Sequence, residues 1–78
     1  MTAEHRCALA SLHLGVLFVA EQIFELADAT DDEHQRRHLL AAARALNGID
    51  EKQRAPDEYL AALAWTLEQV AIELREIT

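Results

Sequence analysis

Residues that interrupt helices are almost absent from this chain, which contains two glycines and one proline among its 78 residues. Alanine, leucine, glutamate, glutamine and arginine, all good helix formers, fill most of the other positions. No segment has the strict alternation of apolar and polar residues that indicates a half-buried strand. We therefore predict an all-α fold. The chain is also too short for a second core, so residues 1–78 should form a single helical domain.

Three helices follow from the few start and stop signals. Thr30 and Glu33 match a capping box, in which the threonine side chain accepts from the amide of Glu33 and the glutamate reaches back. Gly48 predicts a left-handed residue at the end of this second helix, with Ile49 as the apolar contact that often follows. Pro56 suits the first turn of a third helix that begins after a loop. The predicted helices cover about residues 3–27, 31–47 and 56–77.

One apolar stripe runs along each predicted helix at helical spacing, so three helices with short connections should form an up-down-up antiparallel bundle. The stripe residues are His5, Leu9, Leu12, Val16, Val19, Ala20, Ile23 and Ala27 on the first helix, Leu39, Leu40, Ala43 and Leu46 on the second, and Leu60, Leu63, Leu67, Val70, Ala71 and Leu74 on the third. These residues are the predicted core.

A second set of apolar residues lies outside these stripes, and we call them the outer residues: Leu14 and Phe18 on the first helix, and Ala61, Trp65 and Ile72 on the third. A bundle of this length buries one stripe per helix, so several of Leu14, Phe18, Trp65 and Ile72 should remain exposed in a single subunit. Aromatic residues are common interface anchors. We therefore predict an interface here, for a homodimer or a partner helix. The alternative is scattered surface apolar residues that need no partner.

The acidic balance of the chain limits its partners. Fourteen Asp and Glu residues against seven Lys and Arg give a formal charge of -7, which repels nucleic-acid phosphates and anionic membranes. The apolar run from Val16 to Ala20 is much shorter than a membrane span, and the N-terminal residues lack the features of a secretory signal. Cys7 is the only cysteine, so no internal disulfide can form. We expect a soluble, cytoplasmic protein that binds neither nucleic acid nor membrane.

Carboxylates gather around the predicted connection between the first two helices. The predicted acidic patch comprises Glu21, Glu25, Asp28, Asp31, Asp32 and Glu33. Solvated helix faces and helix-dipole complementation account for such residues in many proteins. The alternative is an inhibitor that imitates nucleic-acid charge and occupies a basic groove, by analogy of size and charge with some phage-encoded proteins, anti-CRISPR proteins among them. Three arginines, Arg36, Arg37 and Arg44, interrupt this surface and weaken the analogy.

Histidines raise the question of a metal site. Asp31, His34 and His38 fall on one stripe of the second helix, and a histidine pair four residues apart can bind zinc or nickel when further ligands converge. A fourth ligand is not evident, so we expect no metal and no other cofactor. A metal-binding protein that uses His34 and His38 is the third functional hypothesis. Phosphate loops and nucleophile elbows are absent from the sequence. The sequence therefore favours a regulatory or adaptor protein that binds other proteins and is not an enzyme.

Overall fold

The computed structural model describes residues 3–49 and 55–78, and within these ranges it contains three helices and no strand. The helices are α1 (Ala3–Asp28), α2 (Glu33–Asn47) and α3 (Pro56–Arg75). The all-helical prediction is confirmed. The predicted start of the second helix at residue 31 is two residues early, and the predicted end of the third at residue 77 is two residues late. Most of the predicted loop between α2 and α3, residues 50–54, lies outside the described residues.

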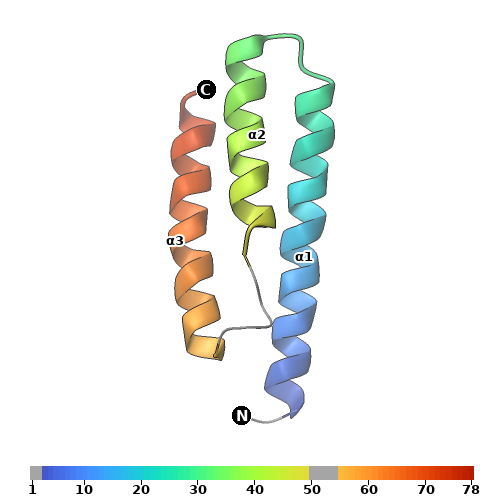
Figure 1. The fold of residues 1–78 in the computed structure, drawn as a ribbon, viewed down its shortest axis with the longest axis vertical. Coiled ribbons are helices and arrows are strands. Elements are labelled where there is room, and N and C mark those ends of the chain that lie inside the picture. The colour runs from blue at the N-terminus through green and yellow to red at the C-terminus, as the bar shows by residue number, and fades with distance from the viewer. Residues whose placement is uncertain (1–2, 50–54) are drawn as a thin grey trace.

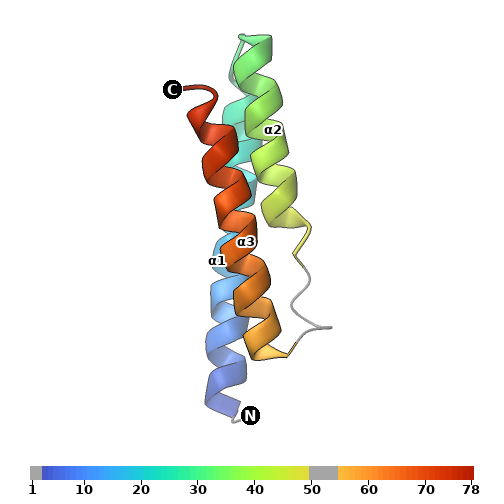
Figure 2. The ribbon, with the colours of Figure 1, turned by 90° about the vertical axis from the view of Figure 1, so that its left-hand side faces the viewer.

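The helices lie side by side along the long axis of a molecule that measures 46 × 19 × 18 Å. The chain ascends through α1, descends through α2 and ascends again through α3 (Figure 1). In Figure 1 α2 lies between the other two helices, whereas in Figure 2 it stands to one side of both. α2 packs closely against both neighbours, while α1 and α3 approach each other at few points. The side of the molecule formed by α1 and α3 therefore stays open.

The core lies where α2 meets its two neighbours. Ala20 and Ala27 on α1 and Ala42 and Ala43 on α2 are at most 1% exposed, and such small side chains let two helix backbones approach closely. Larger side chains complete this core, among them Val16, Leu39, Leu46, Ile49, Tyr59, Leu63 and Val70. Helix α2 is therefore the central element, and each of the other helices uses only the face turned toward it.

The turn between α1 and α2 is capped differently from the prediction. The side chain of Asp32 accepts a hydrogen bond from the amide of Gln35 at 3.0 Å, so Asp32 is the N-cap of α2. The hydroxyl of Thr30 instead donates to the carbonyl oxygen of Leu26 at 2.7 Å and closes the last turn of α1. The capping-box prediction is wrong, because a carboxylate directly before Glu33 already satisfies a free amide of the first turn.

The backbone at the C-terminal end of α2 also differs from the prediction. Gly48 has φ -84° and ψ -6°, which is right-handed helical backbone, and its amide donates to the carbonyl oxygen of Arg44 at 3.0 Å. The prediction of a left-handed residue is wrong, because the helical hydrogen bonding continues through this glycine. Ile49, predicted only as the apolar contact after this glycine, is buried and belongs to the core. Pro56 occupies the first turn of α3 as predicted.

The buried faces of α1 and α3 differ from the predicted stripes. Tyr59 and Thr66, which the prediction left out, are buried on α3 beside Leu63 and Val70. Both helices are apolar around much of their circumference, so the sequence pattern does not select which part faces α2. The side chain of His5 lies outside the described residues. The predicted core residues that are instead exposed are Leu12, Val19, Leu60, Leu67, Ala71 and Leu74.

Candidate interaction surfaces

All five outer residues are exposed. The exposed fractions are 62% for both Phe18 and Trp65, and Leu14, Ala61 and Ile72 are exposed as well. They lie on two helices, α1 and α3, on faces that α2 does not cover. A single subunit thus leaves both large aromatic side chains in contact with water, as the sequence predicted. Their role as an interface stays a prediction.

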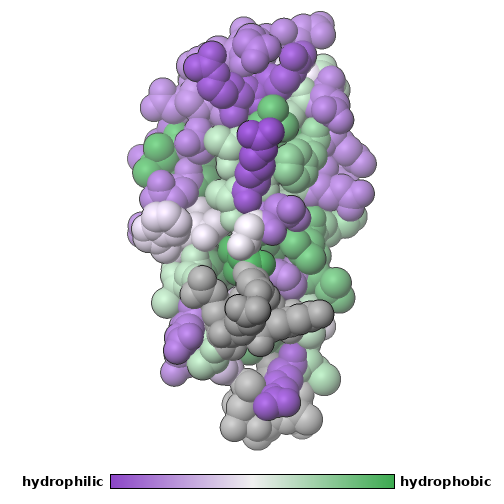
Figure 3. All heavy atoms as spheres, in the orientation of Figure 1, coloured by the Kyte–Doolittle hydropathy of each residue, from purple (hydrophilic) through white to green (hydrophobic). Residues whose placement is uncertain are grey.

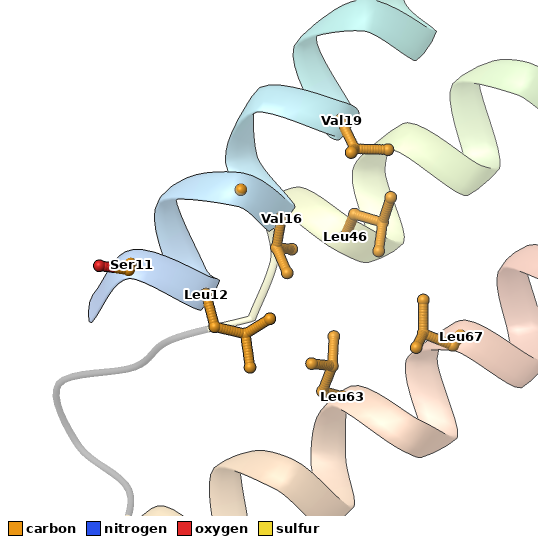
Figure 4. A pocket seen from close by; sticks show the side chains of 8 residues that line it. Ser11, Leu12, Val16, Val19, Leu46, Leu63 and Leu67 are labelled. Carbon is orange, nitrogen blue, oxygen red and sulfur yellow. The ribbon is translucent and has the colours of Figure 1, made fainter. Parts of the chain in front are cut away.

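A second apolar surface is a groove between α1 and α3, with α2 at its base. Figure 4 shows Leu12 and Val16 of α1 pointing toward Leu63 and Leu67 of α3, with Leu46 of α2 between the two helices. The main hollow has a volume of about 470 Å³, and an adjacent hollow of about 420 Å³ extends past Leu12 toward the start of α3. All residues that line the main hollow are uncharged: Ser11, Leu12, Gly15, Val16, Val19, Leu46, Leu63 and Leu67.

Two rows of exposed residues, one on α1 and one on α3, include residues that line the two hollows and extend past them to Leu26 and Leu74. We call them the groove rows: Leu12, Val19 and Leu26 on α1, and Leu60, Leu67 and Leu74 on α3. Within each row the residues are seven positions apart, a spacing that keeps side chains on one face over several turns. Their exposed fractions run from 36% to 55%. The sequence analysis placed five of the six in the core and did not use Leu26, and the seven-residue spacing is the signal that could have identified them as one surface.

The groove rows and the outer residues face in different directions. At about 100° per residue, Phe18 lies about a quarter turn around α1 from its neighbour Val19. Trp65 lies about 160° around α3 from Leu67 by the same geometry. None of the outer residues is among those that line the groove. Trp65 is therefore the residue that best separates the two surfaces by experiment, because Phe18 lies one turn from Gly15, which lines the groove.

The six residues of the predicted acidic patch are all exposed. They run from the second half of α1 into the start of α2, and Figure 3 shows hydrophilic residues gathered at this end of the molecule. Arg36 reduces the charge there, with its guanidinium 3.4 Å from the carboxylate of Glu33. The same guanidinium donates to the carbonyl oxygen of Thr30 at 2.6 and 3.1 Å, which holds the turn between α1 and α2. The side chain of Arg36 thus stabilises the turn between α1 and α2.

The histidine pair on α2 joins this helix to the end of α3. The rings of His34 and His38 meet edge to face, with centroids 4.7 Å apart. Nδ1 of His38 hydrogen bonds to the Glu73 carboxylate, and Nε2 of His34 lies 3.1 Å from the carbonyl oxygen of Glu76. Among the residues that the structure describes, no group of three or more His, Cys, Asp or Glu side chains could hold a metal ion, and Asp31 does not extend the pair into one.

The segment Arg6–Asp28 of α1 is long and apolar enough to cross a membrane, judged by length and composition alone. The shorter run from Val16 to Ala20, on which the sequence prediction rests, does not reveal this property. Core helices of soluble proteins and N-terminal signal sequences have the same property. Little of the segment is buried within the subunit, so α1 has far more apolar surface than α2 can cover.

No known family model, curated protein or solved structure matches this chain. The function must therefore be argued from the surfaces themselves.

Proposed function

We propose that this chain is a non-catalytic protein-interaction module, a small regulatory or adaptor protein that acts as an antiparallel helical bundle and binds other protein surfaces, a second copy of itself included. The observation that supports this most directly is the 62% exposure of both Phe18 and Trp65. Fully burying a large apolar side chain contributes about 1.5–3 kcal/mol, so a partner that covers both gains a substantial part of its binding free energy there.

A protein partner explains the surface better than a lipid bilayer does. α1 carries polar groups in its middle, since His13 hydrogen bonds to Tyr59 of α3 and Glu21 is exposed. A bilayer core would have to desolvate both groups, and anionic membrane surfaces repel a chain of charge -7. An apolar patch bordered by polar residues is typical of protein interfaces.

Trp65 provides the test, because it is the only tryptophan in the chain. With the purified chain as bait, we expect capture of one defined protein, loss of that capture in Phe18→Glu and Trp65→Glu, and a blue shift of Trp65 emission on mixing with the purified partner. Glu25→Gln, an exposed position on α1, is the control and should capture normally. A chain that stays monomeric, keeps the emission of a solvated indole and captures nothing would contradict the proposal.

A second candidate function is supported by the exposed acidic patch. As an inhibitor of a nucleic-acid-binding protein, the chain would present Asp31, Asp32 and Glu33 to a basic groove. Binding would then weaken steeply as salt rises, and the triple substitution of these residues to Asn, Asn and Gln would abolish it. Binding that is insensitive to salt and to the triple substitution rejects this candidate and leaves the apolar surface as the binding site.

A further inference from the structure

We propose that the groove between α1 and α3 is filled by the same groove of a second copy, in an antiparallel dimer with two-fold symmetry whose axis passes near Val19 and Leu67. The two α1–α3 pairs would form a shared four-helix layer, with an α2 helix covering each outer side. This inference rests on the proposed function, because it too treats exposed apolar side chains as a binding surface. It assigns the groove to a second copy and gives the geometry of that contact.

The area of exposed surface fits one such interface. The chain has 5478 Å² of accessible surface, whereas the scaling of surface with mass predicts about 4,800 Å² for a compact monomer of this size. The excess of about 700 Å² is close to the roughly 800 Å² that each partner buries in a standard protein interface. The surface in excess of the scaling value is thus about the area that one such pairing would cover.

The groove rows are self-complementary. Each row extends over 14 residue steps, from 12 to 26 and from 60 to 74, which at about 1.5 Å per step is about 21 Å of helix. Val19 and Leu67 are the middle residues, with one apolar residue seven positions away on either side. A two-fold axis at the middle therefore places each end residue of a row against an end residue from the second copy. Rows of equal length with a common centre allow the α1 row of each copy to lie against the α3 row of the other, as in an isologous interface.

Gly15 is an independent indication of a close approach from outside the subunit. A glycine inside a helix is less favourable than alanine, and here a Cβ atom would meet nothing within 4 Å. The backbone of Gly15 also has no positive φ. Nothing within the described subunit therefore needs a glycine at this position. Gly15 lines the groove between Leu12 and Val19, where the absence of a side chain would let the helix of a second copy pack closely.

The distribution of charge favours the antiparallel orientation. The residues that line the main hollow are uncharged, so pairing brings no carboxylates face to face at the centre. The acidic patch lies toward one end of the subunit, where α1 connects to α2. Antiparallel pairing puts the two acidic patches at opposite ends of the dimer, which lowers their repulsion. Salt should therefore strengthen the dimer by screening the remaining repulsion.

Sedimentation equilibrium of the full chain tests the pairing, with a matched charge control. We expect a wild-type dimer at micromolar concentration that tightens as salt rises. Val19→Glu and Leu67→Glu should each weaken the dimer at least about a hundredfold, because a buried, unpaired charge is costly. Gln35→Glu, which adds the same charge at an exposed position of α2 away from both surfaces, should leave the dimer unchanged. Phe18→Glu and Trp65→Glu distinguish the groove from the outer residues as the site of pairing. Gly15→Ala should weaken the dimer about tenfold through overpacking.

Helix content measured by circular dichroism accompanies each sample. If the subunit loses helix when the dimer dissociates, the milder variant Val19→Ser provides the test. Its helix content should rise with protein concentration, whereas the helix content of Phe18→Ser should not. A concentration-independent helix content in Val19→Ser, together with a wild-type chain that sediments as a monomer, overturns the inference.

Other outcomes separate this inference from the proposed function. If Phe18→Glu or Trp65→Glu breaks the dimer while Val19→Glu and Leu67→Glu do not, the groove pairing is wrong and the outer residues mediate self-association. If the wild type is monomeric but captures a protein through the outer residues, the pairing fails while the proposed function holds. Binding of the monomer to phosphatidylcholine vesicles, lost in Val19→Glu, would assign the groove to lipid and overturn the pairing.

Discussion

The hydroxyl of Tyr59 on α3 lies 3.1 Å from Nδ1 of His13 on α1, and the two rings meet edge to face with centroids 5.7 Å apart. Tyr59 is only 1% exposed, and it is the largest fully buried side chain among the described residues. This contact joins two helices that otherwise approach each other at few points. It therefore helps to set the distance between the two walls of the groove.

Tyr59→Phe removes the hydroxyl and leaves the ring in the core. We expect a loss of about 1 kcal/mol in the free energy of unfolding, the usual net contribution of a hydrogen bond within a protein. Urea unfolding followed by circular dichroism measures it. The double-mutant cycle with His13→Ala isolates the pair, and the two losses should be non-additive by about 0.5–1.5 kcal/mol. Additive losses would mean that the His13 contact does not contribute.

The close approach of α1 and α2 depends on alanines with no exposed surface. Ala42→Leu adds volume where the side chain is 0% exposed, so we expect a destabilisation of about 1–3 kcal/mol from overpacking. Ala61→Leu makes the same chemical change at an exposed position on α3 and should change the stability by less than about 0.5 kcal/mol. Thermal unfolding of the two variants compares them. Equal melting temperatures would contradict the tight packing of α1 on α2.

The number and type of the helices were predictable because their signals are local. The scarcity of glycine and proline sets the helical class, and Pro56 marks the start of α3 one position after its N-cap. The cap of α2 was not predictable to the residue, since Thr30, Asp31 and Asp32 are all good capping residues. Only the geometry of the turn, in which Thr30 bonds back to α1, selects Asp32.

The groove could not be derived from one apolar stripe per helix. On α1 and on α3, apolar residues recur every seven positions in two neighbouring series; on α1 one series includes Val16 and the other includes Val19. Only one of the two series can face α2. Choosing between them requires the positions of all three helices, which is tertiary information. The outer residues were predictable as exposed, because Phe18 and Trp65 each lie about a quarter turn or more around their helices from both of these series.

Asp32→Ala tests the corrected cap of α2. Removing an N-cap side chain costs about 0.5–2 kcal/mol, and here the lost acceptor is the carboxylate that bonds the amide of Gln35. Asp31→Ala removes the same charge from an exposed position next to it, so it controls for the helix dipole and should cost clearly less. Thr30→Ala should also cost less, since its hydroxyl bonds only the end of α1. A ranking with Thr30→Ala as the most destabilising would restore the capping box.

His38 and Glu73 form a partly buried contact between the start of α2 and the end of α3, with side-chain exposures of 20% and 32%. We expect His38→Ala and Glu73→Ala to be coupled by up to about 1 kcal/mol in urea unfolding, the range of partly screened polar pairs. His34→Ala serves as the comparison, because His34 contacts a backbone carbonyl and not Glu73. Its loss should therefore add to that of Glu73→Ala without coupling.

Zinc should not stabilise this chain, because among the described residues no further side chain completes a site with His34 and His38. Nδ1 of His38 bonds Glu73, and Nε2 of His34 lies beside the carbonyl oxygen of Glu76. A structural zinc site takes four ligands in tetrahedral geometry, and a ligand that binds only the folded chain raises its melting temperature. Equimolar zinc should therefore leave the melting temperature unchanged. A rise that disappears when His34 and His38 are both replaced by alanine would show that the pair binds metal.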